Sequence, residues 1–474
     1  MDILQVRGGK PLCGSVQLSG SKNAATKLIV ASLLSNKRCT FFNVPDVWDV
    51  TQTLMMCQEV GMDFVFDRQA KILEVHTPEL KTTHIPQRFS GSNRVPILMV
   101  GALLARAEED ITVPFSVGMS SDTAPLDYHV EALKALGVSI ERKVSRKEGS
   151  LQASSPQGLK GAVIVLPYPS VGATENTILA AVTAKGTTII KNAAVDPEIV
   201  ELMLFLQKLG ANISLDVDRV ITVHGTRLFH PVEHSILPDR VEAAAFASLA
   251  LATSGRIFVH GAEHASLITL LNAFREIGGS FRVEGDGIEF FTESALRGGI
   301  HIETDVHPGF LTDWQPHFVI LLTQAHGSSI VHETVFENRL GYVDTLNSMG
   351  AEITPFRQCL GGRLCRFNDH SHPHSLIVKG KTPLNGASIT IPDLKAGFSY
   401  LSAALVARGE STITGIELLT RGHEHIVEKL KGLSADLTLV PSSPHNPLEP
   451  VDLFAFDVKG LEKISYTIRS GCDH

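Results

Sequence analysis

Six stretches of the chain share one order of hydrophobic and polar positions. In each, a polar or Gly/Pro-containing start precedes a run rich in Ala, Leu and Val, and then a small-residue turn and a β-branched segment. Because the Ala/Leu/Val runs are apolar nearly all round, they predict helices that are enclosed by other structure. The six stretches begin at Ser19, Arg94, Pro169, Pro238, Thr312 and Pro392.

Each enclosed helix is followed by a second, amphipathic helix pattern that ends at a small residue. Glycine just past the last helical residue is typical of a left-handed C-terminal cap. A short strand follows, as at 138–140 and 211–213. The unit therefore recurs about every 70 residues, as a structural repeat does. The predicted helix stops are Gly61, Gly137, Gly210, Gly278, Gly350 and Ser434.

Six copies of a strand–helix–strand–helix unit predict an α/β fold. A solenoid is the alternative that any repeat raises, but fully apolar helices favour two lobes of three units each, with helices inside and sheets outside. We expect the chain to cross between lobes within 229–238. The predicted lobes are 20–235 for the first and 1–19 with 236–440 for the second, and the polar, proline-containing segment 441–474 is expected to be an appendage.

Composition and charge restrict the function. The chain has 474 residues, of which 43% are hydrophobic, so it is globular rather than disordered. Its 42 Lys and Arg against 50 Asp and Glu give a net charge of −8, which argues against a general nucleic-acid binder. An anionic partner must then be held by a few placed cations. Without a signal-peptide pattern or an apolar run of about 18 residues, we expect a soluble, cytoplasmic protein with no membrane partner.

The cysteines and histidines do not predict a metal site. None of the six cysteines forms a CxxC pair or a zinc-like spacing with histidine, so neither a structural metal nor a disulfide is favoured. His370, His372 and His374 lie in a polar, proline-containing stretch, which indicates a loop more than a metal site.

A lysine opens the first enclosed helix, in the sequence GSKNAA at 20–25. A helix N-terminus favours anions and disfavours cations, so Lys22 is unusual there. A bound anion, held by backbone N–H groups together with the ammonium, would remove that conflict. The alternative is an ordinary solvated lysine.

Several motifs occur in one order: GSKNAA, PSVGAT at 169–174, NAAVDPEIV at 192–200, LPDRVEA at 237–243, TDWQ at 312–315, ETVFENR at 333–339 and Arg421-Gly422. This ordered set, over most of residues 1–440, resembles the UDP-N-acetylglucosamine enolpyruvyl transferases. The resemblance implies a two-lobed, inside-out α/β barrel. It also implies transfer of enolpyruvyl from phosphoenolpyruvate to the 3′-hydroxyl of UDP-N-acetylglucosamine with release of phosphate, the first committed step of peptidoglycan synthesis, without a metal or organic cofactor.

The resemblance also implies the site residues. Lys22, Arg339 and Arg421 would hold the phosphate and carboxylate of phosphoenolpyruvate, and Asp313 would orient the attacking hydroxyl and take its proton. The alternatives are an N-cap role for Asp313 before a helix near Trp314, and surface ion pairs such as Arg421 with Glu424. The other implied substrate contacts are Asn23, Arg94, Asp127, Ser170, Val171, Gly172, Val335 and Lys395.

The sequence departs from the family pattern in the lid loop 113–127. Where the family has a cysteine, or in some members an aspartate, as proton donor, alignment from the two ends places Val117 or Ser120. Asp122 is the only carboxylate at the loop tip, so it is the candidate acid if burial raises its pKa; the alternative is a solvated turn aspartate. Three further positions differ from the residue that the family usually has: Ala124 replaces an arginine, Tyr168 a lysine and Lys395 an arginine.

These departures leave two alternatives to the family reaction. One is a paralogous transferase with a different nucleotide or sugar acceptor. The other is a non-catalytic homologue that binds a nucleotide-sugar.

Overall fold

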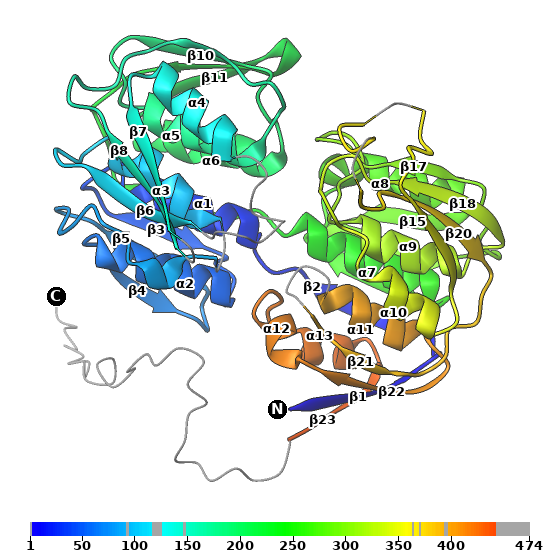
Figure 1. Cartoon of the computed structure of the whole chain (residues 1–474). Coiled ribbons are helices and arrows are strands. Elements are labelled where there is room, and N and C mark those ends of the chain that lie inside the picture. The colour runs from blue at the N-terminus through cyan, green and yellow to red at the C-terminus, as the bar shows by residue number, and fades with distance from the viewer. Residues whose placement is uncertain are drawn as a thin grey trace, which may run out of the picture.

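The molecule has two lobes, each built around its own hydrophobic core (Figure 1). This computed structural model describes residues 2–91, 94–115, 126–145, 148–362, 365–368, 371–392 and 397–441. One core extends from Ala24 to Ile236, and the other combines Leu4–Leu18 with Ala243–Leu437. The predicted two-lobed α/β architecture is therefore confirmed, while the residue boundaries of the lobes stay a prediction. Of the segment 441–474, only Pro441 lies within the described residues.

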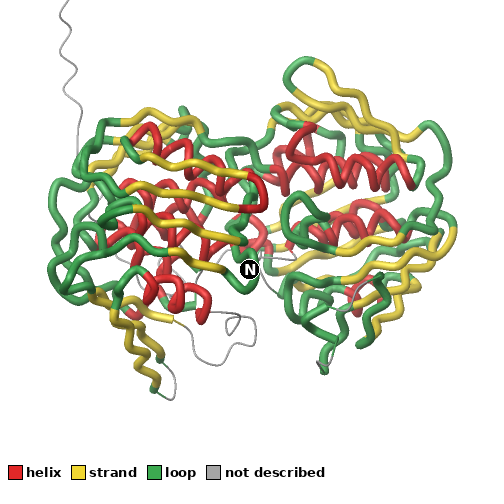
Figure 2. Tube along the Cα trace, turned by 90° about the horizontal axis from the view of Figure 1, so that it is seen from above, coloured by secondary structure: helices red, strands yellow, loops and turns green. Residues whose placement is uncertain are grey.

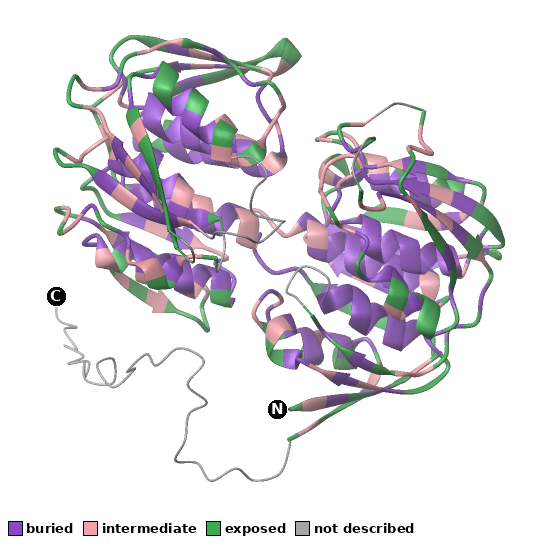
Figure 3. Ribbon diagram, viewed as in Figure 1, coloured by how far each residue is buried: buried purple, intermediate pink, exposed green. Residues whose placement is uncertain are grey.

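The six apolar runs form the inner helices, which lie in the interior of each lobe with strands around them and are almost wholly buried (Figures 2 and 3). Their lack of a polar face leaves no side that gains from contact with water, so both lobes enclose them. In the first lobe they are α1 (Lys22–Ser32), α3 (Val95–Leu103) and α5 (Val171–Ala181). In the second lobe they are α7 (Arg240–Ala252), α9 (Gln315–Thr323) and α11 (Gly397–Val406).

The amphipathic helices follow in the predicted places, and each ends at its predicted stop. The five glycine stops have φ between 86° and 120°, and Ser434 has φ 64°. Positive φ carries little steric cost for glycine, which explains five of the six choices. The helices are α2 (Trp48–Glu59), α4 (Leu126–Ala135), α6 (Pro197–Leu209), α8 (His264–Glu276), α10 (Val343–Ser348) and α13 (Ile426–Gly432), the last preceded by α12 (Ile416–Thr420).

The first lobe has three sheets on its outside, with orders β13-β3-β5-β4, β6-β8-β7 and β11-β12-β10-β9. Their strands are β3 (Cys39–Phe42), β4 (Asp63–Asp67), β5 (Ile72–His76), β6 (Ile111–Phe115), β7 (Ser139–Val144), β8 (Gly149–Ser154), β9 (Val163–Val165), β10 (Thr187–Lys191), β11 (Asn212–Asp216), β12 (Val220–His224) and β13 (Val232–Ser235). Two short 3-10 helices, Gln87–Phe89 and Val217–Arg219, complete the lobe.

The second lobe has the orders β15-β16-β14-β2, β17-β18-β20-β19 and β21-β22-β1-β23. Its strands are β1 (Ile3–Gly8), β2 (Cys13–Gln17), β14 (Arg256–His260), β15 (Gly279–Glu284), β16 (Gly287–Thr292), β17 (His301–Glu303), β18 (Gly327–His332), β19 (Glu352–Phe356), β20 (Ser375–Gly380), β21 (Ser388–Thr390), β22 (Gly409–Thr414) and β23 (Asp436–Val440). β1 and β2 thus bring the start of the chain into sheets of the second lobe.

The second to fifth units each contain two strands more than the sequence pattern predicts: the return strand of a hairpin, and a further strand that precedes the next inner helix, as β9 precedes α5. After the second helix, the chain forms an antiparallel hairpin, such as β4–β5, β15–β16 or, across a longer connection, β19–β20. Return strands such as β5 and β12 are five residues long and alternate between buried and more exposed positions, so their hydrophobic signal is weak.

The chain passes between the lobes through two segments that lie side by side. Ser21 N donates to Leu237 O at 2.8 Å, and Asp239 N donates to Ser19 O at 2.9 Å. The crossing therefore comes at the end of the predicted stretch 229–238, most of which belongs to the first lobe through β13. Gly20 is required here because an added Cβ would lie 1.9 Å from Asn43 O. Within the described residues, no helix is both long and apolar enough to cross a bilayer.

Candidate active site

Asp313 and Arg339 form an ion pair just before α9. Arg339 Nη2 donates to Asp313 Oδ1 at 2.6 Å, and the Arg339 side chain is only 7% exposed. The N-cap of α9 is Trp314, without a side-chain capping bond, so the alternative role of Asp313 as N-cap is wrong. Instead the carboxylate is fixed in direction by a guanidinium.

Glu333, a buried carboxylate, holds the loop that carries Arg339. Its Oε1 accepts from the backbone N–H groups of Val335 at 2.9 Å and Phe336 at 2.8 Å. The hydroxyls of Thr304 and Thr312 donate to the two oxygens, each at 2.9 Å. Because Thr312 directly precedes Asp313, one carboxylate orders both sides of the Asp313–Arg339 pair.

Arg94 reaches this pair from the other lobe. Its guanidinium lies 5.3 Å from the centroid of the Phe336 ring, and that of Arg339 lies 5.4 Å from the same centroid. Arg94 immediately precedes α3 of the first lobe, whereas Phe336 belongs to the second. Two of the predicted site residues therefore meet at one ring between the lobes.

Lys22 is the first residue of α1, and Ser21 caps the helix by accepting from Ala24 N. The Lys22 ammonium lies 3.1 Å from Asp49 Oδ2, so it is paired rather than simply solvated. Asp49 supplies part of the negative charge that a cation at a helix N-terminus requires. The neighbouring Asn23 accepts a hydrogen bond from Lys27 Nζ at its backbone oxygen, at 2.9 Å.

Arg421 lies where α12 of the second lobe meets α2 of the first. Its guanidinium is 5.7 Å from the ring centroid of Trp48, and its carbonyl accepts from Trp48 N at 3.1 Å. The buried Nε of Arg421 has no hydrogen-bond partner among the described residues. Glu424, the partner considered as an alternative, is buried and accepts from Lys71 Nζ at 2.6 Å instead. Arg421 and Trp48 line a cavity of about 300 Å³.

Two neutral histidines lie near these cations. Burial, aided by the charge of Lys22, lowers the pKa of His423 to about 3, and burial with Arg339 lowers the pKa of His317 to about 4. Phe398 contacts both rings, at centroid distances of 5.0 and 5.3 Å. Sequence reasoning missed these histidines because neither stands in a recognisable spacing with another polar group.

Comparisons with known proteins show the family of the chain. The EPSP synthase family model (3-phosphoshikimate 1-carboxyvinyltransferase) matches residues 6–430. The chain is 58% identical over 440 residues to the UDP-N-acetylglucosamine 1-carboxyvinyltransferase of Protochlamydia amoebophila, covering 93% of this chain and 95% of the relative. It is 36% identical to the protein of that name from Zymomonas mobilis, over 93% and 100%. The chain belongs to the enolpyruvyl transferase family.

Solved structures show the same fold. The enolpyruvyl transferase NikO from Streptomyces tendae matches with a TM-score of 0.80 at 21% identity, covering 93% of this chain and 99% of that one. The EPSP synthase of Acinetobacter baumannii matches with a TM-score of 0.72 at 18% identity, covering 93% and 100%. The inside-out arrangement of enolpyruvyl transferases is thus the fold of this chain.

The residues expected at the nucleotide are less tightly gathered. Ser170 caps α5 by accepting from Ala173 N, and Val171 opens that helix. An added Cβ at Gly172 would lie 3.1 Å from the ring of His129, so glycine lets α4 and α5 approach. Asp127 is exposed and accepts from Arg142 Nη2 at 2.5 Å, a partner outside the cation group.

Tyr168, which stands where a lysine is frequent in this family, stacks against Arg366 of the other lobe at 4.6 Å. Arg366 also donates to the backbone oxygen of Val335. Arginine is therefore supplied from the second lobe near the position of the missing lysine. Asp122, Ala124, Val117, Ser120 and Lys395 lie outside the described residues.

A buried ion cluster joins the lobes and was not predicted. Arg240 of α7 donates to Asp196 Oδ1 at 2.9 Å and to both oxygens of Glu198, at 3.0 and 2.8 Å. Both carboxylates belong to the first lobe, at the start of α6. These residues belong to the motifs NAAVDPEIV and LPDRVEA, but their pairing across 42 and 44 positions has no local sequence signal.

Proposed function

We propose that this protein transfers the enolpyruvyl group of phosphoenolpyruvate to the 3′-hydroxyl of UDP-N-acetylglucosamine and releases phosphate. Among the features of the site, the Asp313–Arg339 ion pair supports this most strongly. It places a partly exposed carboxylate, able to accept a proton, against a guanidinium able to bind an anion. A cytoplasmic location and a role in peptidoglycan synthesis are parts of the same proposal.

The reaction divides into an addition and an elimination. The sugar hydroxyl oxygen bonds to C2 of phosphoenolpyruvate, its proton passes to Asp313, and C3 takes a proton from an acid. Loss of a C3 proton then restores the double bond as the bond from C2 to the phosphate oxygen breaks. Lys22, Arg339 and Arg421 would hold the phosphate and carboxylate throughout, since charge-assisted hydrogen bonds to such groups are strong.

Asp122 is the proposed acid for the C3 proton. It is the one carboxylate of the lid tip, which has no cysteine. Closure that buries the carboxyl would raise its pKa and keep a proton available. The proposed contacts to the acceptor are Asn23, Arg94, Asp127, Ser170, Val171, Gly172 and Val335. Lys395 is a further proposed cation.

The test is release of phosphate from phosphoenolpyruvate with and without UDP-N-acetylglucosamine. We expect release only with the sugar, and a loss of about 10²–10⁴-fold in kcat for Asp313→Asn, because an amide cannot take the proton. Asp344→Asn, an exposed carboxylate on α10, is the matched control. Turnover with another acceptor but not this one would indicate the paralogous transferase, and binding without turnover on any acceptor would indicate the non-catalytic homologue.

A further inference from the structure

Two cysteines and two histidines meet at one end of the sheet β17-β18-β20-β19. His332 ends β18, His374 directly precedes β20, and Cys359 and Cys365 lie on the connection between β19 and β20. β18 and β20 pair with His332 opposite Ser375, and β19 pairs with β20 with Phe356 opposite Ser375. Sheet register, not sequence spacing, therefore gathers the four side chains. One ligand atom from each lies within 4.8 Å of every other.

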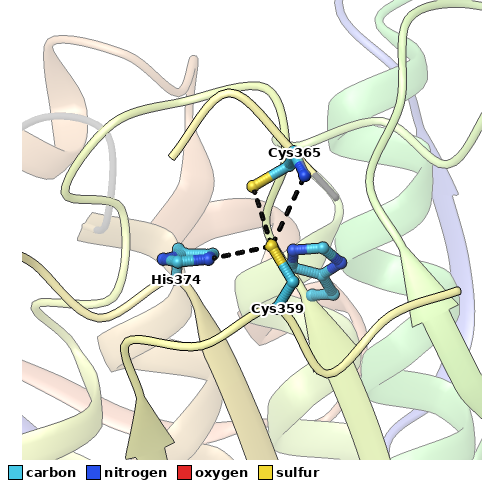
Figure 4. A group of neighbouring side chains, drawn as sticks. Cys359, Cys365 and His374 are labelled. Carbon is cyan, nitrogen blue, oxygen red and sulfur yellow. Dashed lines mark hydrogen bonds between the residues drawn. The ribbon is translucent and has the colours of Figure 1, made fainter. Parts of the chain in front are cut away.

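The separations agree with tetrahedral coordination. Cys359 Sγ lies 3.5 Å from Cys365 Sγ and 3.5 Å from His374 Nε2 (Figure 4). At a Zn–S distance of about 2.3 Å and a Zn–N distance of about 2.0–2.1 Å, two thiolates lie about 3.8 Å apart, and a thiolate and an imidazole nitrogen about 3.6 Å. All four atoms lie within 4.8 Å of one another, so no separation in the group exceeds these values by more than about 1.2 Å.

The unsatisfied imidazole of His332 points to a missing partner. The residue is 0% exposed, and neither ring nitrogen has a hydrogen-bond partner among the described residues. Its Nδ1 is 3.3 Å from Glu303 Oε2 without hydrogen-bond geometry, which leaves Nε2 as the free atom. A buried polar group without a partner is costly and rare, so a ligand that accepts the Nε2 lone pair accounts for it.

The surroundings have the features of a metal site's outer shell. Glu303 lies beside His332, and the carbonyl of His372 is 3.4 Å from His374 Nδ1, as expected of groups that orient metal-binding histidines. Backbone N–H groups also point at both sulfurs, from Cys365 to Cys359 Sγ at 3.4 Å and from Phe367 to Cys365 Sγ at 3.3 Å.

We propose that Cys359, Cys365, His332 and His374 bind a structural zinc ion. Two thiolates and two imidazoles in a closed tetrahedron suit zinc, whereas Mg²⁺ and Ca²⁺ prefer oxygen ligands. With all four positions taken by protein, the ion has no open site for a substrate, so its role is to hold the β19–β20 connection. Gly361 shows how closely that connection packs, since an added Cβ would lie 2.2 Å from His332 Nδ1.

The proposed zinc site adjoins a residue that contacts the first lobe. Arg366, which follows the ligand Cys365, contacts Tyr168 of the first lobe and the backbone of Val335. Zinc binding would fix this arginine where the two lobes meet. Any effect on substrate binding rests on the proposed function, whereas the zinc content does not.

The test measures metal in the purified full-length protein under reducing conditions. We expect about one zinc per chain by mass spectrometry of elements, lost in Cys359→Ser and in His374→Asn, and retained in the control Cys13→Ser, whose exposed thiol lies on β2. Because a variant could fail to fold, Co²⁺ is also titrated into chelator-treated wild-type protein. The expected result is the intense visible absorption of tetrahedral cobalt with a thiolate charge-transfer band.

Two results would overturn the proposal. One is a wild-type protein that lacks zinc after growth with zinc and shows no thiolate–cobalt band on titration. The other is a Cys359–Cys365 disulfide that persists in the freshly isolated protein and excludes the metal. Either result leaves the phosphate-release assay unaffected, so failure of the zinc site and failure of the proposed function are distinguishable.

Discussion

Replacing Glu333 with alanine tests how the loop holding Arg339 is built. The change removes an acceptor of four hydrogen bonds, from Thr304, Thr312, Val335 and Phe336. Each is worth about 1 kcal/mol net, and of the donors left behind the two threonine hydroxyls belong to buried residues and the two backbone N–H groups to partly buried ones. Burial raises the pKa of Glu333 despite these donors, so part of the gain is offset by desolvation. We therefore expect a loss of about 3–5 kcal/mol in the free energy of unfolding.

Thermal unfolding measures this loss, as a fall of roughly 10 °C or more in the Tm of the second lobe. Activity should fall as well, because the Asp313–Arg339 pair loses its support on both sides. Glu352→Ala is the control, since Glu352 is exposed and its ion pair with Lys379 is worth about 0.5 kcal/mol. If Glu333→Ala and Glu352→Ala have the same Tm and both retain wild-type kcat/KM, the assigned role of Glu333 is wrong.

Three further predictions concern a buried carboxyl, the interlobe arginine and the lid. Burial raises the pKa of Glu175 to about 7 from 4.5. The stability that protonation of Glu175 contributes to the folded state is therefore complete below pH 4.5 and is lost as the pH rises through 7. In urea unfolding, Glu175→Gln should therefore be more stable than wild type near pH 8 by up to roughly 3 kcal/mol, and equally stable near pH 4. A difference in the free energy of unfolding that does not change with pH would contradict this. Because Arg366 contacts Tyr168 and Val335, and Val335 is a proposed contact of the acceptor, Arg366→Ala should raise the KM for UDP-N-acetylglucosamine roughly five- to tenfold while leaving that for phosphoenolpyruvate unchanged. An equal rise in both KM values would contradict a role of Arg366 at the acceptor. Asp122→Asn should abolish turnover, and activity that survives the substitution would exclude Asp122 as the acid. A fosfomycin-type epoxide should not label the protein, since the lid loop has no cysteine; covalent labelling of the protein would contradict this expectation.

The sequence predicts those parts of the fold that depend on local patterns. The inner helices follow from their apolar runs, and the helix ends follow from residues such as Gly61 and Gly210, whose positive φ suits glycine. The strands that follow the helix stops, such as β15 and β19, are predicted. The return strands of the hairpins, such as β5 and β12, are missed, because they are only five residues long and alternate between buried and more exposed positions. Their pairing depends on the sheet and not on the strand itself.

The site shows the same division. The sequence pattern predicts Lys22 at a helix start and Asp313 just before a helix. The resemblance to the family implies their roles and the other site residues. The pairing of Arg240 with Asp196 and Glu198, and the approach of Arg94 to Phe336, arise only when the lobes meet. His332 belongs with Cys359 only through the register of β18, β20 and β19, so a search for short spacings passes over it.

The proposed reaction forms an ether bond at the 3′-oxygen of the sugar, so it is tested most directly by identifying the product. Phosphoenolpyruvate and UDP-N-acetylglucosamine are incubated with the wild-type protein, and the purified product is analysed by mass spectrometry and NMR. We predict a UDP-sugar carrying one enolpyruvyl ether, with its two vinyl protons, on the 3′-oxygen, formed in equal amount with phosphate. An unchanged UDP-N-acetylglucosamine, or enolpyruvyl attached at another oxygen, would contradict the proposed reaction.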